Sequence, residues 1–170
     1  MGTVIIELEP LAASFLGTEF PQLKHILGSN GPVDVLAYDD GAASTAEAAF
    51  WDFIANSYGS GNLTVAILWY ADTASSGDVV WGAAIKAITP DTDTQDVETD
   101  AFATASTVTD SHLGTTGQRL HKATITVSNL DSLAASDHVQ LKLYRDADSG
   151  ADTMSGDAHV QKIIVSYSDT

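Results

Sequence analysis

The sequence contains no cysteine and few basic residues, and each shortage excludes a class of protein. Without cysteine the chain has neither disulfide bridges nor thiolate metal sites, so its stability must come from a packed core or from assembly with other chains. Only 7 Lys and Arg residues stand against 23 Asp and Glu residues, which gives a net charge of −16. Such a surface repels nucleic-acid phosphates and anionic lipid, so neither nucleic acid nor a membrane is expected as a partner.

Long hydrophobic runs are also missing. No run approaches the roughly 18 apolar residues that a membrane-spanning helix needs. The first ten residues contain Glu7 and Glu9 and no basic residue, which is not the pattern of a secretory signal peptide. What is present is a chain of 170 residues, 44% hydrophobic and 18% charged, which is enough for one domain with a real core.

From Asn30 onward, short apolar runs alternate with clusters of Gly, Asp, Ser and Pro. The runs have strand length and are rich in β-branched and aromatic residues. The expected strands are Val33–Tyr38, Ala48–Ala55, Leu63–Ala71, Val79–Ile88, Phe102–Val108, Leu120–Val127, His138–Tyr144 and Val160–Tyr167. They predict an all-β fold, an antiparallel β-sandwich that is jelly-roll-like, with an immunoglobulin-like sandwich as the alternative.

The hydrophobic pattern of the strands predicts which faces are buried. In His138–Tyr144, the apolar residues alternate with polar ones, so one face should pack on the core. Leu63–Ala71 and Val79–Ile88 are apolar on both faces and are expected to be central strands covered on both sides, with another subunit as a candidate cover for one side. Trp69 and Trp81 are therefore expected in the core or in a subunit contact. The polar segment ADTASSGD between these two strands predicts a hairpin loop.

Residues 1–31 have no stable periodicity and are interpreted as an N-terminal arm, followed by a β-sandwich domain at 32–170. Pro21 confines any helix in this segment to begin there. The arm is expected to dock on its own domain or on a neighbouring subunit, and the alternative is a disordered tail. Its predicted interface residues are apolar: Ile5, Ile6, Leu8, Phe15, Leu16, Phe20, Leu23 and Ile26.

The segment LKLYRDADSGADTMSGDAHVQKIIV places several carboxylates between two strands. Asp146, Asp148 and Asp152, with Gly150 among them, are residue types that calcium-binding loops contain, although their spacing is not that of an EF-hand. The competing interpretation is a solvated connection whose Asp side chains cap turns. Calcium is the only cofactor that the sequence brings into consideration. The second acidic stretch, from Pro90 to Asp100, has no glycine to form a metal loop and is predicted to be a mobile charged loop.

No catalytic motif emerges, so the chain is not expected to be an enzyme. The five histidines (His25, His112, His121, His138 and His159) show no HxH, HxxxH or HExxH spacing, although the last three could meet on one face. No serine lies in a nucleophile elbow. Aromatic residues raise a different question, because exposed rings can stack on sugars. Those considered for sugar binding are Trp51, Trp69, Trp81, Tyr38, Tyr58 and Tyr70.

Two long segments carry a resemblance to a known family. They are AAFWDFIANSYGSGNLTVAILWYADTASSGDVVWGAAIKAI and LGTTGQRLHKATITVSNLDSLAASDHVQLKLYRDADSGADTMSGDAHVQKIIVSYSD. The sequence resembles small β-sandwich structural proteins of tailed bacteriophages, in its WYA-type and VVW-type middle strands and its Asp-rich turn before a final strand ending in Tyr. The resemblance runs from about Ala48 to the C-terminus and includes no catalytic signature.

The resemblance implies a non-enzymatic virion protein. A capsid decoration (cement) protein is the leading form, located on the capsid surface and bound to the major capsid protein or other virion proteins. It would oligomerise, with a trimer favoured, and stabilise the particle through its arm. The alternative is a tail-fibre or a carbohydrate- or receptor-binding β-sandwich module on a tail appendage.

Overall fold

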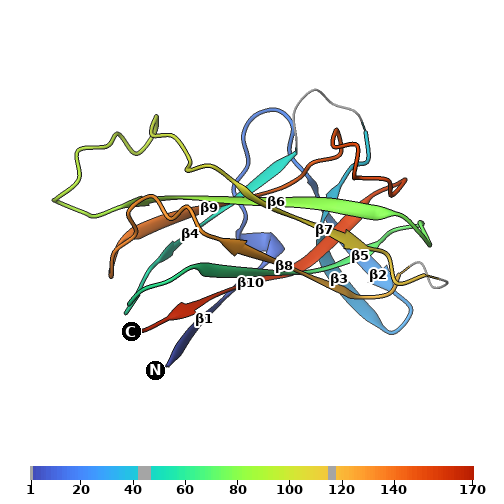
Figure 1. The fold of residues 1–170 in the computed structure, drawn as a ribbon. Helices are drawn as coiled ribbons and strands as arrows, with labels where there is room; N and C mark the ends of the chain where they lie inside the picture. Colours follow the sequence, from blue (N-terminus) through green and yellow to red (C-terminus); the bar gives the residue numbers. More distant parts are fainter. Residues whose placement is uncertain (1, 42–46, 115–117) are drawn as a thin grey trace.

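The computed structural model describes residues 2–41, 47–114 and 118–170 and consists of two antiparallel sheets packed face to face (Figure 1). A six-stranded sheet has the order β2-β3-β10-β5-β8, with β1 also paired to β10, and a four-stranded sheet has the order β4-β9-β6-β7. The elements are β1 (Thr3–Leu8), a 3₁₀ turn (Pro10–Ala12), β2 (Gln22–Gly28), β3 (Gly31–Tyr38), β4 (Ala48–Ile54), β5 (Leu63–Ala71), β6 (Asp78–Ile88), β7 (Ser106–Ser111), β8 (His121–Val127), β9 (His138–Arg145) and β10 (Ala158–Ser168). The predicted antiparallel β-sandwich is therefore confirmed. Within the described residues, no helix is long and apolar enough to cross a membrane.

The core forms because alternate residues of each strand point between the two sheets. In β9, Val139, Leu141 and Leu143 are fully buried, while the residues between them are only partly buried, as the alternation predicts. Trp69 from β5 and Trp81 from β6 meet edge to face across the sheets, with ring centroids 6.0 Å apart, and both are fully buried. Each large ring removes roughly 150–250 Å² from water, so these contacts are a major part of the core.

The connection between β5 and β6 is not the predicted hairpin. β5 belongs to the six-stranded sheet and β6 to the four-stranded sheet, so ADTASSGD carries the chain from one sheet to the other. Two strands that are buried on both faces have the same hydrophobic pattern whether they pair in one sheet or lie in opposite sheets. The sequence pattern therefore did not distinguish a hairpin from a connection between sheets. The strand predicted at Phe102–Val108 begins at Ser106 instead, because the residues before it fold against β6.

The segment predicted as an arm supplies two strands of the six-stranded sheet. β1 runs antiparallel to β10 from Thr3↔Ser168 to Leu8↔Ile163, and β2 forms a hairpin with β3. Leu8 is part of the core, and the indole of Trp51 donates to the carbonyl of Glu9 at 2.9 Å. The segment predicted as an arm at residues 1–31 thus docks on its own domain as β structure and continues directly into β3.

Candidate functional site

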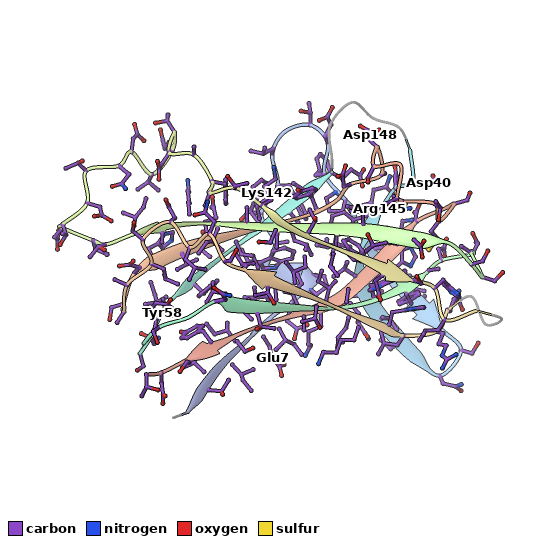
Figure 2. All side chains as sticks on the ribbon, in the orientation of Figure 1. Glu7, Asp40, Tyr58, Lys142, Arg145 and Asp148 are labelled. Carbon is purple, nitrogen blue, oxygen red and sulfur yellow. The ribbon has the colours of Figure 1, made fainter. Side chains whose placement is uncertain are left out.

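The floor of the candidate site is the outer face of the four-stranded sheet. Alternation along β9 places Gln140, Lys142 and Tyr144 on this face, because their neighbours point into the core. Pairing with β4 sets Phe50 opposite Lys142, and pairing with β6 sets Lys86 opposite Gln140. Figure 2 shows Lys142 on the outer side of this sheet and Glu7 on the opposite side of the sandwich. The register thus gathers an aromatic, an amide and two ammonium groups from three strands.

Two loops, distant in sequence, form the walls. On the β4 side, the backbone of Ser14 pairs with that of Phe50 through N···O distances of 2.8 and 3.0 Å. On the β6 side, the 89–105 connection is held by a bond of 2.7 Å from Lys86 Nζ to the Val97 carbonyl and by one of 2.9 Å from the Ala103 amide to the Ile85 carbonyl. Together they enclose an open groove of about 290 Å³, termed the outer groove. It is lined by Ser14, Phe15, Leu16, Phe50, Lys86, Glu98, Asp100, Phe102, Gln140 and Lys142.

Aromatic rings cover both sides of the outer groove. Phe50 and Phe102 lie 5.7 Å apart between ring centroids, and Phe15, which is 37% exposed, lies 5.5 Å from Phe20. Next to the groove, the ring of Tyr144 lies over Gly82: a Cβ at that glycine would come within 2.1 Å of Tyr144 Cζ. Burial raises the pKa of the Tyr144 phenol, and the nearby carboxylate of Asp146 raises it further. Glycine at position 82 therefore leaves room for the ring to lie over the sheet.

The polar groups of the groove are arranged for hydrogen bonding to a ligand. The amide of Gln140 donates to Asp52 Oδ1 at 3.0 Å, which fixes its orientation. Glu98 and Asp100 stand in the wall, and Glu98 follows a turn in which its own amide donates to Asp96 Oδ1 at 2.9 Å. Apolar surface with a few oriented polar groups is the usual composition of a small-molecule site. The arrangement can bind an amphipathic ligand.

The predicted calcium residues are not brought together. Asp152 points inward and forms a two-bond pair with Arg145, with Nη2···Oδ1 at 2.7 Å and Nε···Oδ2 at 3.0 Å, and both side chains are almost fully buried. Asp148 is exposed, and the carbonyl of Asp146 accepts from the Ser149 amide at 3.0 Å as part of a turn. Across the described residues, no three His, Asp or Glu side chains converge as a metal site requires. The structure gives Asp152 a structural role that the sequence pattern did not reveal.

The tryptophans considered for sugar binding are buried. Trp51, Trp69 and Trp81 are at most 1% exposed, and so is Tyr38. Trp69 and Trp81 therefore lie in the core rather than at a surface, and the indole of Trp69 donates to Asp110 Oδ2 at 2.7 Å. Phenylalanines line the groove instead: Phe15 is 37% exposed, Phe102 is half-buried, and Phe50 is 7% exposed. The alternation of β4 was the available signal, because it puts Phe50 on the face opposite Trp51.

Two further aromatics from the same set lie away from the outer groove. Tyr58 packs against Tyr167 near the chain termini and donates to the Gly61 carbonyl at 2.6 Å. Tyr70 lies on the outer face of the six-stranded sheet, edge to face with His159 at 5.1 Å between ring centroids. Neither ring reaches the groove.

The predicted interface residues have mixed positions. Leu8 is buried and Ile6 packs against the core, so these two hold β1 in place. By contrast, several apolar side chains between Ile5 and Leu27 face solvent. The exposed fractions are 63% for Ile5, 67% for Leu11, 37% for Phe15, 64% for Leu16, 40% for Phe20, 48% for Leu23 and 81% for Leu27. Ile26 is half-buried.

The three late histidines do not meet. His121 stacks on Trp69 at 4.4 Å and lies 4.8 Å from His112, measured between ring centroids; burial lowers its pKa, and the neighbouring His112 lowers it further. His138 lies on the outer face of the four-stranded sheet, 3.8 Å from Asp52. His159 lies on the other sheet with both ring nitrogens buried and without a hydrogen-bond partner, and burial lowers its pKa.

Comparisons with known proteins match at the level of the fold. No family model matches the sequence, and no curated protein matches it. Among solved structures, a xylan-binding module of family 15 superposes with a TM-score of 0.50 over 98% of both chains, at 13% identity. A cellulose-specific module of family 28 has a TM-score of 0.46 and 9% identity, over 91% of this chain and 84% of the other. A family 11 carbohydrate-binding module from Clostridium thermocellum, in complex with a β-1,3-1,4-mixed-linked tetrasaccharide, has a TM-score of 0.46 and 12% identity, over 96% of this chain and 87% of the other.

Proposed function

We propose that this protein is a non-catalytic carbohydrate-binding β-sandwich module that holds a glycan in the outer groove. The observation that carries the proposal is the groove itself, in which Phe15, Phe50 and Phe102 surround side chains able to bond to hydroxyl groups. A sugar ring has apolar C–H faces and a polar rim, so it matches a site with this composition. The likeness in fold to a xylan-binding module supports the same conclusion.

The groove is small and open, which fits a short stretch of an extended chain. Its volume of about 290 Å³ lies at the lower end of the range for ligand sites. Stacking between two aromatic rings contributes about 0.5–1.5 kcal/mol beyond the burial of area, and we take a similar value for a sugar ring on phenylalanine. We therefore expect weak binding, in which the loss of one ring is easily measured.

The test is titration calorimetry against xylan, mixed-linked β-glucan and cellulose oligosaccharides. Phe15→Ala removes a partly exposed ring from the groove, and we expect affinity to fall about threefold to tenfold. Leu27→Ala is the matched control, because it removes an equally apolar, more exposed side chain from β2, outside the groove. Absence of glycan binding across a broad array, or equal affinity of both variants and the wild type, would refute the proposal.

A second candidate function is a structural one, in which the protein coats a virion as a decoration protein. Its support is the set of exposed apolar side chains in the N-terminal segment, because apolar surface gains free energy when another molecule covers it. They are Ile5, Leu11, Leu16, Leu23 and Leu27. A trimer, the major capsid protein as partner and a place on the virion belong to this proposal. Co-sedimentation with phage particles tests it, and binding that survives polar substitution of Leu16 and Leu27 would refute it.

A further inference from the structure

Basic side chains are scarce in this protein, and two of them lie in the outer groove. The chain has 7 Lys and Arg residues against 23 acidic ones. Lys24, Arg145 and Lys162 are neutralised by carboxylates in ion pairs. Lys86 and Lys142, in contrast, line the groove, and within the described residues no carboxylate oxygen lies within 4.0 Å of either ammonium.

Lys86 is a buried cation with incomplete compensation. It is 6% exposed, its ammonium donates to the Val97 carbonyl at 2.7 Å, and it lies 5.6 Å from the centroid of the Phe102 ring. An ammonium has three protons to donate, and one carbonyl and one aromatic face do not replace the counterion that a buried charge usually has. The position therefore favours a ligand that brings negative charge.

Lys142 lies close enough to act with Lys86. Lys86 pairs with Gln140, and Lys142 pairs with Ala84, so the two lysines are diagonal neighbours on one face of adjacent antiparallel strands. Residues in such diagonal positions lie about 7–8 Å apart, a distance across which long side chains can interact. The Lys142 ammonium lies 5.3 Å from the centroid of Tyr144, at the edge of the groove.

We infer that the outer groove selects acidic glycans, with the carboxylate of a uronic acid held between Lys86 and Lys142 while the sugar ring packs on the phenylalanines. This inference rests on the proposed carbohydrate-binding function. Glu98 and Asp100 also line the groove and repel an anion, so they restrict the carboxylate to the lysine side and accept hydroxyl groups elsewhere. Because the whole molecule carries a charge of −16, its overall field repels an acidic chain, and the preference must come from this local pair.

The test compares oligogalacturonate and oligoglucuronate with the same oligosaccharides after reduction of their carboxyl groups to alcohols. We expect the wild type to bind the acidic forms about tenfold more tightly than the reduced forms. Lys142→Met keeps the length and loses the charge, so it should remove this preference, whereas Lys142→Arg should keep it. Lys122→Met is the matched control, since Lys122 lies on the outer face of the six-stranded sheet. Thermal unfolding checks that each variant is folded.

The outcomes separate this inference from the function on which it rests. Equal binding of acidic and reduced oligosaccharides by the wild type, with binding still lowered by Phe15→Ala, overturns the acidic preference and leaves glycan binding intact. An acidic preference that persists in Lys142→Met, or that Lys122→Met also removes, overturns the assignment to the lysine pair. Failure of every oligosaccharide, acidic or neutral, to bind overturns both.

Discussion

Replacement of Arg145 by Met should destabilise the fold severely. The guanidinium pairs with Asp152 and also donates to the carbonyls of Met154 at 2.6 Å and Gly156 at 2.8 Å. Removal of one partner from a buried ion pair costs about 3–5 kcal/mol, because the remaining charge has no counterion. Each carbonyl that loses its donor adds about 1 kcal/mol or more. We expect a loss of about 5 kcal/mol, which for a chain of this size lowers the melting temperature by about 10–20 °C.

Urea denaturation followed by tryptophan fluorescence measures this loss, and a double variant identifies its cause. In Arg145→Met with Asp152→Leu, no charge is left unpaired, so the part of the loss due to charge should be recovered. The carbonyls of Met154 and Gly156 stay without donors, and the Val80 amide loses its acceptor on Asp152, so recovery should be incomplete, with about 3 kcal/mol still missing. A loss below about 1 kcal/mol in the single variant is the size of a surface ion pair, and it would refute the structural role argued for Arg145.

Three other predictions concern Gly82, His159 and Asp148. Gly82→Ala places a methyl group against the ring of Tyr144, so it should cost about 1–3 kcal/mol in urea denaturation and weaken glycan binding, whereas Gly150→Ala, with open space at its Cβ, should do neither. His159→Phe should reduce the loss of stability on acidification. Burial lowers the pKa of His159 in the folded protein, so below about pH 6.5 the unfolded chain binds a proton that the folded protein does not. The free energy of unfolding therefore decreases as the pH is lowered, by up to about 1.4 kcal/mol per pH unit, until the pH is below the folded-state pKa. An unchanged slope in the variant would contradict this account. Added calcium should change neither the melting temperature of the wild type nor that of Asp148→Asn. A rise in the melting temperature of the wild type alone would contradict this and would support a cation site at Asp148.

Much of the strand pattern could be predicted because it depends on local alternation. Leu63–Ala71 was placed with the observed bounds, and the buried face of β9 followed from Val139, Leu141 and Leu143. Pairing between strands was harder, because it depends on contacts between residues far apart in the chain. The extended N-terminal segment is an example, because β1 pairs with β10, which lies more than 150 residues away in the sequence. The residues around Ile5 do not indicate which strand they pair with.

The site was less predictable than the fold for the same reason. The alternation in His138–Tyr144 predicts that Gln140, Lys142 and Tyr144 share one face of the strand. Nothing in the sequence indicates that two loops would enclose that face. The wall residues Phe15 and Phe102 come from segments that join the sheet only in the folded chain. The clustering of carboxylates in the sequence suggested a calcium loop. In the structure, however, Asp152 forms an ion pair with Arg145, the basic residue that directly precedes the Asp-rich segment.

The position of β10 has a consequence for the order in which the molecule is made. This strand contacts β1 and β3 along one edge and β5 along the other, so it joins the early strands to the middle of the chain. β10 leaves the ribosome after all of them. Until then β1 has no partner and the β2–β3 hairpin has no neighbour, and their apolar faces, with Leu8 and Leu36 among them, are open to water. Nascent chains of this protein should therefore depend on chaperones, or on rapid synthesis, to avoid aggregation before the sheet closes.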